Sequence, residues 1–133
     1  WDIYEKKIKN SFTLQFPHIK QTDVNHKRIS VAVFSQKILY TGLFDGRVFS
    51  WGMQTGELID EFVSHHEEIT AIKKINSLVL VTGDKTGVLN LWDTASGNLD
   101  KSFIFKGAVT DLLYNPSSLH LVLNRKSVAS LDL

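Results

Sequence analysis

The sequence predicts an all-β fold that is assembled from repeated four-stranded antiparallel sheets. Short runs of β-branched and aromatic residues alternate with turns that contain glycine, asparagine or aspartate, which is the pattern of strands. No apolar pattern with a period of about 3.6 residues persists over three turns, so no helix is predicted. The stretch 41–51 recurs at 82–92, 41 residues later, and a period of this length indicates a repeat architecture.

The composition excludes several classes of protein. The 133 residues are 43% hydrophobic, enough for a packed core, and the net charge of +1 gives no bulk attraction to nucleic acid. The absence of cysteine excludes disulfides and cysteine-based metal sites, and it is typical of a reducing compartment, so we expect an intracellular protein, cytoplasmic or nuclear. No run approaches about 18 consecutive apolar residues, so no membrane span is predicted.

The beginning of the chain is predicted to close one repeat before a long loop. Residues 8–16 alternate in polarity and predict a strand, which Pro17 ends because proline has no N–H to donate to a sheet. We therefore assign residues 1–16 to the end of a preceding repeat. The polar stretch 17–28 is the longest predicted loop.

The first complete repeat is predicted over 29–63. Its two initial apolar runs are of the length expected for buried strands, and Asp45-Gly46 tolerate the positive φ angles of a tight turn. Its predicted strands are 29–34, 38–41, 48–51 and 58–63.

The second complete repeat, 69–105, follows the same plan. A shift of 41 residues places Gly46 on Gly87 and Trp51 on Trp92. A partial third repeat, 108–133, ends on Leu131-Asp132 where the pattern calls for Trp-Asp. The predicted strands are 69–75, 78–82, 88–92, 99–105, 108–114, 119–123 and 128–133.

Trp92-Asp93 close the third strand of a repeat of about 40 residues, and this pattern, recurring in register over nearly the whole chain, resembles the WD-repeat β-propeller family. The resemblance implies blades of four strands, called a to d in chain order. The loops that join d to the next a, and b to c, lie on one face of the propeller. About three blades are expected. Because known propellers have about four to eight blades, we expect the segment to be part of a larger propeller or to complete its ring with another chain.

The resemblance also implies a structural hydrogen-bond network in each blade, from a His before strand a, a hydroxyl in strand b, a turn Asp and the Trp of strand c. In the second repeat the implied residues are His65, Thr82, Asp84 and Trp92, with Asp84 two residues before its usual place. In the first repeat they are Thr41, Asp45 and Trp51, with His26 out of step. The third repeat has Leu121, Arg125 and Leu131 there, so its blade is expected to depend on packing alone.

Catalytic and metal-binding alternatives receive little support from the residues. His65-His66-Glu67-Glu68 could suggest a metal cluster, but adjacent side chains of an extended segment point in opposite directions and no third ligand is near in sequence. The stretch 82–87 lacks the pattern of a phosphate-binding loop and a following helix. We therefore predict a protein with no enzyme activity, no metal and no cofactor.

The residues left for function lie in loops on the implied d–a and b–c face, at 17–28, 43–47, 64–68, 84–87 and 124–127. The arginines there could grip an acidic or phosphorylated peptide, with an exposed aromatic residue as an apolar anchor. The candidate partner-binding residues are Phe44, Arg47, His66, Lys85, Arg125, Lys126, Lys27 and Arg28.

The predicted function is that of a non-catalytic scaffold, which presents propeller loops to other proteins, or to further propeller repeats, in a multiprotein complex. This step follows from the family resemblance, since a fold does not fix a function. The alternative is a propeller subunit that contacts nucleic acid in a ribonucleoprotein assembly. A steep dependence of binding on salt would distinguish the alternative from peptide docking.

Overall fold

The computed structural model describes residues 14–16 and 28–132, and the described part consists of strands, turns and loops. Its strands are short and lie where apolar and β-branched residues concentrate. In chain order they are β1 (Ile29–Ser35), β2 (Ile38–Leu43), β3 (Val48–Gly52), β4 (Leu58–Phe62), β5 (Ile69–Lys74), β6 (Val79–Asp84), β7 (Val88–Asp93), β8 (Asn98–Ile104), β9 (Val109–Asn115), β10 (Ser118–Leu123) and β11 (Ser127–Asp132).

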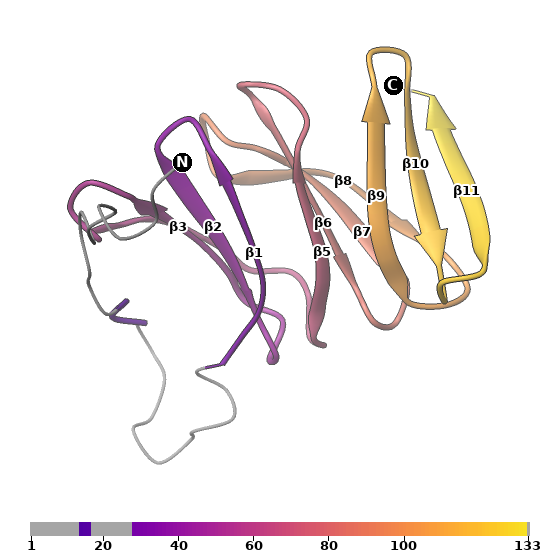
Figure 1. Ribbon diagram of the computed structural model, residues 1–133, viewed down its shortest axis with the longest axis horizontal. Helices are drawn as coiled ribbons and strands as arrows, with labels where there is room; N and C mark the ends of the chain where they lie inside the picture. The colour runs from indigo at the N-terminus through magenta and orange to yellow at the C-terminus, as the bar shows by residue number, and fades with distance from the viewer. Residues whose placement is uncertain (1–13, 17–27, 133) are drawn as a thin grey trace, which may run out of the picture.

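The strands form three separate antiparallel sheets that stand side by side (Figure 1). The first sheet has the order β1-β2-β3-β4, the second β5-β6-β7-β8, and the third consists of β9, β10 and β11. The first strands of the three sheets are neighbours, since β1 contacts β5 and β5 contacts β9. This arrangement confirms the all-β prediction of repeated meandering sheets.

The predicted strand ends differ from the structure at two repeated positions. The sequence predicts strands that end at Thr41 and Thr82, each followed by a glycine, but β2 runs on to Leu43 and β6 to Asp84. The ladder explains this extension, because Gly42 pairs with Val31 and Gly83 pairs with Ala71. At the start of the chain, residues 14–16 lie in no strand, and the rest of the predicted strand 8–16 lies outside the described residues, as does nearly all of the loop 17–28.

Apolar side chains fill the two spaces between the sheets. Between the first and second sheets, Tyr40, Phe62 and Trp92 belong to one buried cluster, and the ring of Phe62 meets that of Trp92 edge to face with centroids 5.3 Å apart. Between the second and third sheets the cluster is mainly aliphatic. A third cluster lies on the far side of the first sheet, where Phe16 packs edge to face on Trp51.

Hydroxyl groups join each sheet to the next. The Ser30 hydroxyl donates to the carbonyl of Ile69 on the second sheet, over 2.6 Å. The Thr70 hydroxyl, 40 residues further along, makes the same bond to the carbonyl of Val109 on the third sheet. The first strands of successive sheets are therefore held together by polar bonds as well as by packing.

The outer face of the third sheet differs in character from the corresponding faces of the other two. His120 occupies the place that Tyr40 and Val81 hold in β2 and β6, and its ring bonds to Ser118 over 3.0 Å and to Ser130 over 2.6 Å. The prediction that this sheet depends on packing alone is therefore wrong, because a Ser–His–Ser chain crosses β10 and β11. His120 and its serines share this outer face with Leu113 and Val128, whose side chains are 52% and 66% exposed.

Candidate functional site

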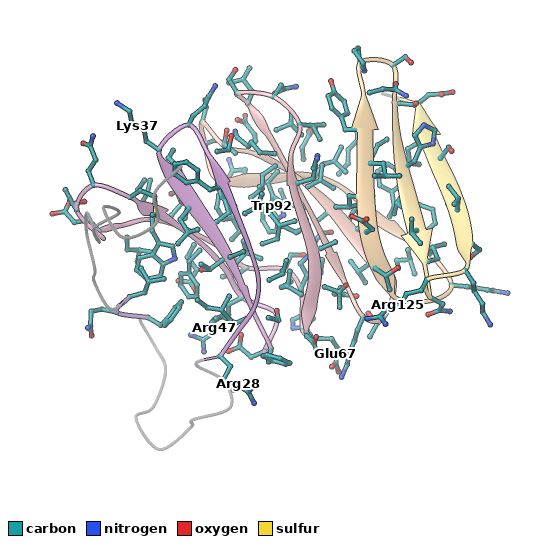
Figure 2. All side chains as sticks on the ribbon, viewed as in Figure 1. Arg28, Lys37, Arg47, Glu67, Trp92 and Arg125 are labelled. Atoms are coloured by element: carbon teal, nitrogen blue, oxygen red, sulfur yellow. The ribbon has the colours of Figure 1, made fainter. Side chains whose placement is uncertain are left out.

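The loops predicted to share one face do so in the structure. Figure 2 shows Arg28, Arg47, Glu67 and Arg125 along one edge of the three sheets, whereas Lys37 lies at the opposite edge. We call the edge with Arg47 and Arg125 the loop face. It is formed by the turns after β2, β6 and β10 together with the segments that precede β1, β5 and β9.

Phe44 and Arg47 are less available to a partner than the sequence suggests. Phe44 is 40% exposed, but the Arg28 guanidinium lies over its ring, 5.5 Å from the centroid. The Arg47 Nε is 3.2 Å from a carboxylate oxygen of Asp45, and the other oxygen of Asp45 accepts from the Arg47 N–H. The expected apolar anchor and the expected arginine fork are therefore both engaged within the chain.

The middle of the loop face is held by an exposed ion pair. Lys85 Nζ lies 3.6 Å from a carboxylate oxygen of Glu67, and the Lys85 N–H donates to the carbonyl of Glu68. His66 is exposed beside them, whereas His65 is buried. Both side chains of the ion pair are about half exposed, so the pair contributes little to stability but neutralises the charge of Lys85.

Arg125 and Lys126 are adjacent exposed cations of the loop face, and, like Arg28 and Lys106 in the segments before β1 and β9, they make no ion pair within residues 14–16 and 28–132. They lie in the tight turn between β10 and β11, where Asn124 and Arg125 have φ angles of 51° and 60°. This turn is fixed from below, because Asn124 Oδ1 accepts from the Ala108 N–H and the Thr110 hydroxyl accepts from the Arg125 N–H. The two charges are therefore presented on a rigid support. Lys27, the remaining candidate, lies outside the described residues.

The second sheet contains a buried chain of polar side chains. The Trp92 indole donates to the Thr82 hydroxyl over 2.8 Å, and that hydroxyl is 2.7 Å from His65 Nε2. His65 Nδ1 lies 2.8 Å from a carboxylate oxygen of Asp84. With the proton on Nδ1, every donor in this chain meets an acceptor. These bonds thus join β6, β7 and the segment before β5.

Asp84 reaches His65 although it lies two residues before its usual place. Because β6 continues to Asp84, this residue pairs with Ile69 in the ladder and its carboxylate faces the segment before β5. The second carboxylate oxygen accepts from the Thr86 N–H, the Thr86 hydroxyl and the Val88 N–H. Asp84 therefore anchors both His65 and its own turn.

The first sheet keeps only part of this arrangement among its described residues. Trp51 donates to the Thr41 hydroxyl over 2.9 Å, as Trp92 does to Thr82. Asp45 differs from Asp84, because its carboxylate is turned to Arg47 in its own turn. The resemblance implies that Asp45 joins a His-centred network, but in the structure Asp45 pairs with Arg47 instead. His26 lies outside the described residues.

Two residues of the second sheet's chain were not anticipated. The Asn90 amide nitrogen is 3.2 Å from His65 Nε2, and the Asn90 carbonyl accepts from the Ser102 hydroxyl over 2.6 Å. Asn90 is fully buried. Its place in an otherwise apolar strand was the available signal, since a buried amide needs partners.

Burial and hydrogen bonding shift the pKa values of the two ionisable groups in this chain. Burial lowers the pKa of His65 below its usual value, and the bond to Asp84 only partly offsets this effect. Burial alone would raise the pKa of Asp84, but the bonds from Thr86, His65 and Val88 together hold that pKa below its usual range. His65 is therefore neutral and Asp84 is ionised near neutral pH.

These shifts predict a loss of stability in acid. Because the pKa of His65 is lower in the folded than in the unfolded chain, the unfolded chain binds more protons as the pH falls below about 6.5, so the free energy of unfolding falls. Asp84 adds a further loss below the usual carboxyl range. We expect the urea midpoint to decrease between about pH 7.5 and 5.5. His65→Gln should flatten this decrease, and the exposed control His66→Gln should retain most of it, because the charge of His66 is the smallest cause of the lowered pKa of His65; equal slopes in all three proteins would contradict the assignment.

The side chains of residues 14–16 and 28–132 form no cluster that meets the requirements of a metal site, since no group of three or more His, Asp or Glu among them could hold a metal ion. The same ranges contain no helix long and apolar enough to cross a bilayer. The two histidines of 65–66 point in opposite directions, one buried and one exposed.

Three meandering antiparallel sheets that stand side by side define a segment of a β-propeller, and the resemblance noted in the sequence is confirmed at the level of the fold. The structure is similar to the β-propeller domain of Cps50 (Swd1) from Myceliophteria thermophila, with a TM-score of 0.72 and 19% identity over 81% of this chain and 36% of that one. It is also similar to the computationally designed Ika4 protein, with a TM-score of 0.72 and 23% identity over 79% of this chain and 66% of that one.

The chain is also similar in sequence to a curated protein. The chain is 27% identical over 115 residues to the pre-rRNA-processing protein IPI3 of Mycosarcoma maydis. The match covers 84% of this chain and 19% of that protein, so the chain spans about a fifth of its length. No protein-family model matches the chain.

Proposed function

We propose that this chain is a non-catalytic scaffold segment of a propeller, whose loop face docks an acidic segment of a partner protein within a multiprotein complex. The sequence similarity to a pre-rRNA-processing protein favours a complex that acts in that process, in the nucleus. The second sheet's polar chain supports a structural reading, because its His, Asp and hydroxyl are buried and mutually bonded.

The observation that carries the proposal is the turn at Arg125 and Lys126. The other described cations at the middle and first turns of the loop face are engaged, Lys85 with Glu67 and Arg47 with Asp45. Arg125 and Lys126 are exposed and make no ion pair within the described residues, on a turn that hydrogen bonds hold in place. Two adjacent unneutralised cations can bind carboxylates or a phosphorylated side chain, and the fixed turn limits the loss of backbone entropy on binding.

Charge reversal at this turn tests the proposal. In the intact protein, we expect Arg125→Glu combined with Lys126→Glu to reduce the amount of at least one stoichiometric partner protein by about tenfold, as measured by quantitative mass spectrometry after affinity purification. The matched control is Lys37→Glu, because Lys37 lies in a similar left-handed turn, with a φ of 68°, at the opposite edge. An unchanged set of partners in the double variant would contradict the proposal.

Nucleic acid is the competing partner for the same two cations. If RNA were bound there, ribonuclease would release the partner proteins and the affinity would fall steeply with salt. If the partner is a protein segment, its retention survives ribonuclease and depends less steeply on salt. The two readouts therefore separate the scaffold from the alternative function.

A further inference from the structure

A cleft of about 250 Å³ opens between the first and second sheets, away from the loop face. Its rim is formed by the turns after β1, β5 and β7. Lys37, in the first of these turns, does not line the cleft and lies in Figure 2 at the edge opposite Arg47. Small-molecule pockets are typically about 300–1,000 Å³, so this cleft is of a size for a single side chain. It is independent of the surface proposed above.

The floor of the cleft contains an unpartnered hydroxyl. Tyr40 is 3% exposed, and its hydroxyl makes no hydrogen bond within residues 14–16 and 28–132. Every fully enclosed side-chain nitrogen or oxygen in those residues has a partner, so the Tyr40 hydroxyl must open to the cleft that Tyr40 lines. A hydroxyl that opens into the cleft and has no partner within the described residues is available to a ligand as donor or acceptor.

The two walls carry opposite charges that are not paired with each other. Asp60 belongs to β4 of the first sheet and Lys74 to β5 of the second. Lys74 Nζ donates to the Ser77 carbonyl and the Thr94 hydroxyl and lies 5.9 Å from the centroid of the Tyr40 ring. Burial lowers the pKa of Lys74. Burial, and to a smaller extent the charge of Asp60, raises the pKa of Tyr40. All three side chains line the same cleft.

These groups select for one kind of ligand. A cation would be repelled by Lys74 and an anion by Asp60, whereas a neutral amide offers a carbonyl to the ammonium or the hydroxyl and an N–H₂ group to the carboxylate. The apolar lining from Ile38, Phe62 and Ile59 suits an aliphatic stem. We propose that this inter-sheet cleft is a binding site for the uncharged amide side chain, glutamine or asparagine, of a peptide segment.

The test compares four capped tripeptides with the intact protein by NMR titration, followed at the amides of Ser77 and Thr94. Ala-Gln-Ala should bind more tightly than Ala-Glu-Ala, Ala-Lys-Ala and Ala-Leu-Ala. Tyr40→Phe, which keeps the ring and the packing, should weaken the glutamine peptide about three- to tenfold because it removes one hydrogen-bonding group. The control Tyr114→Phe, at a tyrosine that does not line the cleft, should change nothing.

A second variant checks the selectivity. Asp60→Asn removes the negative wall, so the preference should shift from Ala-Gln-Ala toward Ala-Glu-Ala. Equal binding of the charged and uncharged peptides, no binding of any of them, or an unchanged affinity in Tyr40→Phe would overturn the proposal.

Discussion

Replacement of Trp92 by alanine is expected to lower the free energy of unfolding by about 3–5 kcal/mol. Trp92 is 3% exposed and fills the space between the first and second sheets, edge to face with Phe62. Its indole also donates to Thr82, the hydroxyl that bonds to His65. The substitution would therefore remove the largest side chain of the inter-sheet cluster and the first donor of the polar chain.

Two further variants separate packing from hydrogen bonding at Trp92. Trp92→Phe keeps an aromatic ring in the cluster but loses the indole N–H and part of the ring volume, so we expect it to cost about 1–3 kcal/mol. Ile104→Ala removes a side chain that is 82% exposed and should change stability by less than about 0.5 kcal/mol. Urea unfolding of the intact protein measures all three. Equal losses for Trp92→Ala and Trp92→Phe would show that packing between the sheets contributes little.

Gly83→Ala is expected to destabilise the protein by about 1–3 kcal/mol, although alanine is a small residue. A Cβ at this position would lie 2.6 Å from Val109 Cγ1 and 2.8 Å from Val109 Cβ. Val109 is β-branched and completely buried, so its Cβ cannot move without its strand. The clash therefore lies between the second and third sheets rather than within one sheet.

A double-mutant cycle identifies this clash as the cause. Gly83→Ala should cost clearly less in a Val109→Gly background, with a coupling energy of about 0.5–3 kcal/mol. Gly42 offers an internal comparison, since a Cβ there would lie 2.5 Å from Ile69 Cγ2 at the preceding junction. Costs that simply add in the double variant would mean that the glycine is needed for another reason.

The repeat period predicted the sheets well because it records a requirement of local structure. The residues of each strand must alternate in polarity or be apolar, and each turn needs residues that tolerate positive φ. Both patterns therefore recur every 41 residues. The family resemblance implied that Trp51 and Trp92 belong to one network with Thr41 and Thr82, and the structure brings each pair within 2.9 Å. These partners belong to neighbouring strands, which the period aligns.

The Thr-Gly dipeptides show where this reasoning was incomplete. The strands predicted from the sequence stop before Gly42 and Gly83, but both glycines lie in strands, where the next sheet approaches the backbone closely. That requirement comes from contact between sheets. A pattern within one repeat cannot show which residue of the following repeat, Ile69 or Val109, will press against it.

For a similar reason, the sequence could not show which basic residues of the loop face form ion pairs. Lys85 and Arg125 are both basic residues in turns of equivalent repeats. Lys85 meets Glu67 because the segment before β5 passes beside its turn. At the turn of Arg125, the segment before β9 bonds with Asn124 only through the backbone of Ala108. Pairing thus depends on how loops from different parts of the chain meet.

The central claim is that partners dock on the loop face at the turn of Arg125 and Lys126. It is tested most directly by comparing the amount of each partner protein retained by Arg125→Glu/Lys126→Glu with the amount retained by Lys37→Glu, in the intact protein and after ribonuclease. We predict a loss of about tenfold for the first variant and none for the second. Equal retention in both, or equal loss in both, would contradict the claim.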